Sequence, residues 1–145
     1  MITIPPYLKK GDTIAITCPA GYMEAANIKT CVKTLQQWGF QVLIGKTVGS
    51  NSNNYFSGTD EERRDELQAM LDEPSVKAIL CGRGGYGVTR IIEQLNFTAF
   101  KKNPKWIICG ISYSITLPLR LKINASTRFG TLRNCASEAV DLLVD

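Results

Sequence analysis

The segment Val76-Lys-Ala-Ile-Leu-Cys-Gly-Arg-Gly-Gly-Tyr-Gly87 joins a short apolar run to a loop with four glycines in six residues. The run from Val76 to Cys81 has the length and apolar character of a buried strand. The residues from Thr89 to Leu95 that follow have the pattern of a short helix. A strand, a tight loop and a helix in succession are typical of α/β proteins, in which ligands bind beyond the carboxyl ends of parallel strands.

The same alternation of apolar runs and helical patterns continues on both sides of this segment. Helices are predicted over Met23–Trp38 and Asp60–Leu71, the second opened by a capping box between Thr59 and Glu62. Further strands are predicted at Thr13–Thr17, Gln41–Ile44 and Trp106–Cys109. The predicted fold class is therefore α/β, with three layers and a mostly parallel sheet.

The composition is that of an ordinary globular domain. The chain has 145 residues, of which 44% are hydrophobic and 21% are charged. Its apolar stretches are far shorter than the roughly 20 residues that span a bilayer, and its first ten residues lack the pattern of a secretory signal. We therefore expect a cytoplasmic protein without a membrane partner.

The cysteines are odd in number and widely spaced: Cys18, Cys31, Cys81, Cys109 and Cys135. No C-x-x-C pair or histidine accompanies them, which disfavours a zinc site. Three of them end apolar strand-like runs, where free cysteine behaves as a small hydrophobe. We expect buried thiols in a reducing cytosol in preference to disulfides, and no bound metal.

The formal net charge of +4 is unevenly distributed. No acidic residue occurs between Gln94 and Asn134, whereas that stretch contains Lys101, Lys102, Lys105, Arg120, Lys122, Arg128 and Arg133. Such a basic strip attracts anionic ligands, but no nucleic-acid-binding motif accompanies it. We interpret it as a solvated surface and expect no nucleic-acid partner.

Gly82, Gly84 and Gly87 satisfy the G-x-G-x-x-G fingerprint of dinucleotide-binding proteins. That fingerprint belongs after the first strand, however, and the acidic residue expected roughly 20 positions later is missing. Four close glycines still indicate that something approaches the backbone closely, and free amides there can stabilise an oxyanion. We expect no nucleotide cofactor.

Several short motifs occur in order along the chain: Leu8-Lys-Lys-Gly-Asp-Thr-Ile-Ala-Ile16, Phe56-Ser-Gly-Thr-Asp-Glu-Glu-Arg63, Lys77-Ala-Ile-Leu80, Gly82-Arg-Gly-Gly-Tyr-Gly87 and Asn103-Pro-Lys-Trp106. With this order and spacing the chain resembles the LD-carboxypeptidases from about Pro5 to Gly110. The resemblance implies a Rossmann-like N-terminal domain similar to class I glutamine amidotransferases.

The resemblance also implies an activity. The family hydrolyses the amide between an L-centre and a D-amino acid, typically releasing D-alanine from murein tetrapeptides during peptidoglycan recycling in the cytoplasm. Some members instead cleave peptide-nucleotide antibiotics of the microcin C type. The mechanism uses serine, histidine and glutamate without a metal, and the enzymes are commonly homodimers. Serine comes from the N-terminal domain, and glutamate and histidine come from a C-terminal domain.

The family nucleophile follows the strand that Trp106–Cys109 matches, where this chain reads Gly110-Ile-Ser-Tyr-Ser-Ile-Thr116. Counting forward from Gly110 selects Ser112, whereas counting back from Thr116 selects a position between the two serines. We favour Ser112 as nucleophile over Ser114, although either could be a helix N-cap. By resemblance, the amides of Gly84, Gly85 and Tyr113 form the oxyanion hole, and Arg83 and Tyr86 bind substrate.

Beyond Thr116 the family pattern decays. We interpret residues 1–116 as the α/β domain that bears the nucleophile, residues 117–145 as a divergent tail of it, and the C-terminal catalytic domain as absent from this chain. The chain contains no histidine, so Ser112 lacks the usual general base and we expect the chain alone to be inactive. The alternative is a non-catalytic module that binds an anionic peptide or nucleotide.

Overall fold

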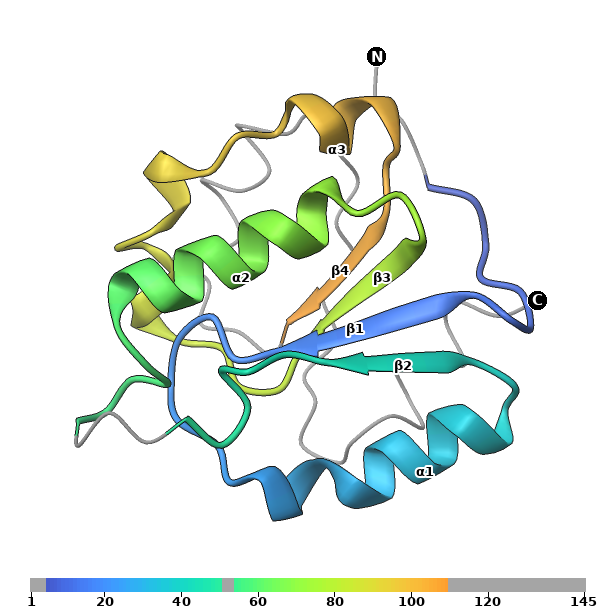
Figure 1. Ribbon diagram of the computed structural model, residues 1–145, viewed down its shortest axis with the longest axis horizontal. Coiled ribbons are helices and arrows are strands. Elements are labelled where there is room, and N and C mark those ends of the chain that lie inside the picture. Colours follow the sequence, from blue (N-terminus) through green and yellow to red (C-terminus); the bar gives the residue numbers. More distant parts are fainter. Residues whose placement is uncertain (1–4, 51–53, 110–145) are drawn as a thin grey trace.

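The computed structural model describes residues 5–50 and 54–109, which form an α/β unit around one parallel sheet (Figure 1). The strand order is β2-β1-β3-β4, and every neighbouring pair is parallel. The strands are β1 (Thr13–Thr17), β2 (Gln41–Ile44), β3 (Val76–Cys81) and β4 (Trp106–Cys109). The predicted parallel sheet and its four strand ranges are confirmed, with β3 in an interior position.

Helices cover both faces of the sheet, as the three-layer prediction requires. The helix α1 (Lys29–Gln37) packs on one face, and α2 (Asp60–Asp72) and α3 (Thr98–Lys102) pack on the other (Figure 1). Side chains of β3 alternate between the two cores: Ala78 and Leu80 lie on the α1 side, and Ile79 lies on the α2 side. Because both faces are covered, this strand is apolar at nearly every position.

The prediction of a helix over Thr89–Leu95 is wrong. Within that range the structure has only a 3₁₀ turn at Ile92–Gln94, and a separate 3₁₀ turn, Tyr86–Val88, precedes it. Forming the first turn of an α-helix costs free energy, and a segment of seven residues gains too few further hydrogen bonds to offset that cost. The segment instead follows the core surface, where Ile91 and Ile92 are buried against α2 and the sheet.

The helix predicted over Met23–Trp38 is shorter than expected, because its first part is a 3₁₀ turn at Ala25–Ile28 that leads into α1. The five-residue helix α3 was not predicted; it buries Phe100 against the core. Within the described parts of the chain, no helix is both long and apolar enough to cross a membrane.

Lys105 departs from the interpretation of the basic strip as a solvated surface. Its side chain is buried, and its ammonium donates hydrogen bonds to the carbonyls of Met70 (3.0 Å) and Glu73 (2.6 Å) at the end of α2. Cations stabilise helix C-termini because the last carbonyls are otherwise unpaired. Lys101 and Lys102 are exposed, as expected.

The predicted capping box at the start of α2 is confirmed. The Thr59 hydroxyl accepts a hydrogen bond from the Glu62 amide at 3.1 Å, and the Glu62 carboxylate accepts one from the Thr59 amide at 2.8 Å. Two amide donors at the helix start are thereby satisfied.

We expect Thr59→Ala to lower the free energy of unfolding by about 1 kcal/mol, because it leaves the Glu62 amide without its acceptor. Urea denaturation followed by circular dichroism measures the change. Thr59→Ser keeps the hydroxyl and should stay close to the parent protein. Equal loss in both variants would show that the cap is not the source of the effect.

Candidate active site

The loops that follow β1, β2 and β3 meet at the carboxyl edge of the sheet. Gly21 forms a β-bridge with Phe56, and the Tyr22 amide donates to the Tyr55 carbonyl at 2.9 Å. The Gly82 amide donates to the Thr17 carbonyl at 2.8 Å, which ties the start of the third loop to β1. Cys18–Gly21 and Gly82–Gly87 therefore lie at the same edge of the sheet.

The glycine loop (Gly82–Gly87) needs its glycines for conformation and close packing. Gly85 has φ +141°, a backbone region that residues with side chains rarely adopt. A Cβ at Gly87 would lie 2.7 Å from the Arg63 guanidinium and 2.9 Å from the Ala20 Cα. The close contacts with Arg63 and Ala20 therefore explain why residue 87 is a glycine.

Gly84 and Gly85 present hydrogen-bond donors at the top of this loop. Both residues are partly exposed, and their amides donate to no acceptor among residues 5–50 and 54–109. Backbone amides without an acceptor in the described part of the chain are donors from which an oxyanion hole can be built. Their assignment to an oxyanion hole stays a prediction, as does that of Tyr113.

Arg83 and Tyr86, the predicted substrate-binding residues, are exposed on the same loop. The Arg83 guanidinium donates to the Tyr22 carbonyl at 3.0 Å and lies over the Tyr55 ring, 5.7 Å from its centroid. The Tyr86 side chain is 66% exposed. The rim of the loop thus combines a positive charge with aromatic surface, a combination that suits an anionic ligand.

A buried arginine lies beneath the glycine loop. Arg63 belongs to α2 and has no exposed surface. Its Nη1 donates to the Pro19 carbonyl at 2.9 Å and to the Gly87 carbonyl at 3.0 Å, and its guanidinium stacks 4.7 Å from the Phe56 ring centroid. One side chain thereby contacts the loops that follow β1, β2 and β3.

Arg63 was not among the predicted site residues, although it ends the motif Phe56–Arg63. A signal was present, because Arg63 lies four, seven and eight residues before Leu67, Met70 and Leu71 on the apolar stripe of α2. A charged residue on such a stripe has a buried partner in most folded proteins.

Asp60 is shared by two arginines. It forms an ion pair with Arg63 and another with Arg90, the second at 2.8 Å. The hydrogen bond from Arg90, aided by the charge of Arg63, holds the pKa of the Asp60 carboxyl below its ordinary value. Burial lowers the pKa of Arg63, and the charge of Asp60 opposes that shift.

Residues 14–132 match the sequence profile of the LD-carboxypeptidase N-terminal domain. The chain belongs to the LD-carboxypeptidase family. The Bacillus subtilis protein named "Probable murein peptide carboxypeptidase" is 37% identical over 101 residues, which cover 70% of this chain and 31% of that protein. The Microcin C7 self-immunity protein MccF of Escherichia coli is 32% identical over 123 residues, or 83% of this chain and 35% of that protein.

The fold agrees with this assignment. The solved structure of MccF in complex with aspartyl sulfamoyl adenosine superimposes with a TM-score of 0.67 at 28% identity, covering 73% of this chain and 32% of that one. The chain spans about a third of the length of the curated relatives it matches. The resemblance predicted from its motifs is confirmed.

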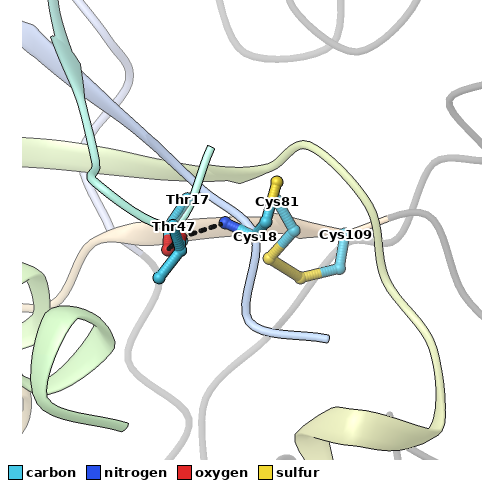
Figure 2. The surroundings of a disulfide bond; sticks show 5 residues. All are labelled: Thr17, Cys18, Thr47, Cys81 and Cys109. Carbon is cyan, nitrogen blue, oxygen red and sulfur yellow. Dashed lines mark hydrogen bonds between the residues drawn. A yellow bond between two sulfur atoms is a disulfide. The ribbon is translucent and has the colours of Figure 1, made fainter. Parts of the chain in front are cut away.

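A polar network anchors the second loop of this LD-carboxypeptidase domain to β1. The Thr17 hydroxyl donates to Glu66 at 2.6 Å, and the Thr47 amide donates to the same carboxylate at 3.1 Å. The Cys18 amide in turn donates to the Thr47 hydroxyl at 2.9 Å (Figure 2). No sequence motif indicated this network, since its members are up to 49 residues apart.

Cys81 and Cys109 lie side by side at the ends of β3 and β4 and form a disulfide, with their Cα atoms 4.8 Å apart (Figure 2). For these two residues the expectation of free thiols is wrong, because the parallel register places them at the same level on one face. Cys18 is a buried free thiol, as expected; Cys31 is also buried, and Cys135 lies outside the described residues. The described part of the chain contains no cluster that could hold a metal ion.

The free thiol of Cys18 lies beside the disulfide (Figure 2). Burial raises the pKa of this thiol to about 11, and the charge of Glu66 adds to the shift, while the Arg83 amide opposes it. The thiolate fraction at pH 8 is therefore about a hundredfold smaller than for an ordinary cysteine.

We expect iodoacetamide to alkylate Cys18 at least ~100-fold more slowly in the folded protein than in urea, because only the thiolate reacts. In the folded protein the rate should keep rising with pH beyond 9, up to about 11. Peptide mass spectrometry after timed labelling measures it. Labelling of folded and denatured protein at equal rates would contradict the buried, neutral thiol.

Ser112, Tyr113 and Ser114 lie outside the described residues. Cys109, the last residue of β4, pairs in register with Cys81, which directly precedes the glycine loop. The last described strand, β4, therefore lies next to the strand that leads into the glycine loop.

Proposed function

We propose that this chain is the nucleophile-bearing part of a serine LD-carboxypeptidase. The enzyme would hydrolyse the amide between an L-centre and a terminal D-amino acid, releasing D-alanine from murein tetrapeptide in peptidoglycan recycling. The observation that best supports this proposal is the parallel pairing of β3 with β4, in which Cys81 lies opposite Cys109. It sets β3, which leads into the glycine loop, next to β4, which precedes Ser112 in the sequence.

In the proposed reaction, the Ser112 hydroxyl attacks the scissile carbonyl carbon as a base takes its proton. The amides of Gly84, Gly85 and Tyr113 hold the resulting oxyanion. Collapse of the tetrahedral intermediate breaks the C–N bond, and the D-amino acid leaves as its amine takes a proton. Water then hydrolyses the acyl-enzyme and regenerates the Ser112 hydroxyl.

In the proposal, the general base of this reaction comes from outside the 145 residues, because the usual base is histidine and the sequence contains none. In the proposal, a C-terminal domain supplies histidine and glutamate, and the complete enzyme works in the cytoplasm as a homodimer without a metal or cofactor. Ser112 is preferred over Ser114 because it stands two residues beyond Gly110, the spacing at which a strand-to-helix elbow would expose a hydroxyl.

Arg83 supports a substrate with a free carboxylate. Its exposed guanidinium lies at the rim of the glycine loop, held by the Tyr22 carbonyl and the Tyr55 ring. A D-amino acid at a peptide C-terminus carries such a carboxylate close to the scissile bond. In our proposal, Arg83 and Tyr86 therefore contact the leaving residue.

The decisive test uses the full-length protein, meaning the product of the complete reading frame that contains this chain. We expect it to release D-alanine from murein tetrapeptide, and mass spectrometry of the tripeptide product measures this. Aspartyl sulfamoyl adenosine serves as the second test compound, because the relative MccF, named for microcin C7 self-immunity, has been solved in complex with it. If the enzyme cleaves only that compound and not the tetrapeptide, its proposed substrate is a peptide-nucleotide and not a murein peptide. Binding without turnover of either would support a non-catalytic module.

A further inference from the structure

We propose that Arg63 is a positioning residue that holds the glycine loop in the geometry needed for its amides to act. Its catalytic consequence rests on the proposed function, whereas its effect on the loop can be measured without any activity.

Arg63 is built into the site through two backbone carbonyls. The same nitrogen, Nη1, donates to Pro19 in the first loop at 2.9 Å and to Gly87 in the glycine loop at 3.0 Å. The second terminal nitrogen pairs with Asp60, which lies on the same helix. A rigid, planar cation thus links α2 to both loops in fixed orientation.

Filling space in the core does not by itself explain why position 63 carries a cation. Burying a guanidinium carries a large desolvation cost, and a well-packed apolar side chain often stabilises a fold as much or more. Arg63 is nevertheless completely buried, and its Nε has no partner among the described residues. An apolar side chain could not donate hydrogen bonds to the carbonyls of Pro19 and Gly87, as Arg63 does.

The loop carbonyl that Arg63 holds is close in sequence to the proposed oxyanion donors. Gly87 is only two residues after Gly85, whose φ of +141° turns the chain into the 3₁₀ turn Tyr86–Val88. With so short a connection, a shift of the Gly87 carbonyl moves the amides of Gly84 and Gly85. A displacement of about 1 Å in a catalytic group lowers a rate by roughly 10²-fold.

Arg90 offers a matched control. Like Arg63, it pairs with Asp60, and its guanidinium lies 5.5 Å from the Phe56 ring centroid. Among the described residues, however, it bonds to neither the Pro19 nor the Gly87 carbonyl. Comparing Arg63→Lys with Arg90→Lys therefore separates the contacts with the loop carbonyls from the shared ion pair and ring contact.

The first measurement is amide hydrogen exchange by NMR on the 145-residue chain. Val88 and Thr89 donate to the carbonyls of Gly85 and Tyr86 within the loop turn. In Arg63→Lys we expect both amides to exchange at least ~10-fold faster, while strand amides of β3 change little, because only the loop loses its anchor. In Arg90→Lys the exchange of Val88 and Thr89 should stay within about threefold of the parent protein.

The second measurement is steady-state kinetics with the full-length protein. Arg63→Lys should lower kcat for D-alanine release roughly 10²-fold with little change in KM, since the loop amides act in the transition state. Arg90→Lys should stay within about threefold. Equal losses of kcat in the two variants, or unchanged exchange of Val88 and Thr89 in Arg63→Lys, would overturn the proposal. Absence of D-alanine release by the parent protein would instead overturn the proposed function, and the exchange contrast would still decide the role of Arg63.

Discussion

Replacing Ser112 by alanine in the full-length protein is expected to lower kcat for D-alanine release by roughly 10⁴- to 10⁶-fold. The variant removes the oxygen that attacks the scissile carbonyl, whereas substrate binding and the oxyanion donors remain. We therefore expect KM to change little. Release of D-alanine under saturating murein tetrapeptide, measured with enough enzyme to detect the residual rate, gives the ratio directly.

Ser114→Ala is the matched control for this experiment. The two serines are two residues apart in the same segment, so general disturbance of that segment should affect both variants alike. We expect Ser114→Ala to retain most of the activity. If Ser114→Ala loses activity and Ser112→Ala retains it, the nucleophile is Ser114, and if both stay active, it lies elsewhere.

The second large effect concerns the 145-residue chain by itself. We expect its rate of D-alanine release to be at least ~10⁴-fold below that of the full-length protein, because a serine hydroxyl without a general base is a weak nucleophile. The sequence has no histidine, so the usual base is missing however the segment around Ser112 is arranged.

The comparison uses purified short and full-length proteins at equal concentration with the same tetrapeptide. Circular dichroism and urea denaturation of the short chain serve as controls, since a folded but inactive chain is the expected result. Turnover by the short chain comparable to that of the full-length protein would overturn the argument that histidine is required.

The secondary structure of the sheet could be predicted from the sequence by itself. All four strands occupy their predicted ranges, because each is a short apolar run bounded by glycine, proline or a polar turn. The capping box of Thr59 and Glu62 was equally local, since its two members are three residues apart. The motifs around the glycine loop also sufficed to identify the family. These features depend on residues that are near neighbours in the chain.

The arrangement of the site was decided only by the tertiary structure. The burial of Arg63 beneath the glycine loop depends on carbonyls 44 and 24 residues away in sequence. The disulfide between Cys81 and Cys109 depends on the parallel register of β3 and β4 across 28 residues. The helix predicted over Thr89–Leu95 failed for the same reason, because core contacts of Ile91 and Ile92 outweighed a weak local preference. Strand ranges and caps follow from local periodicity and hydrogen bonding, whereas register and buried polar contacts arise only when distant segments pack together.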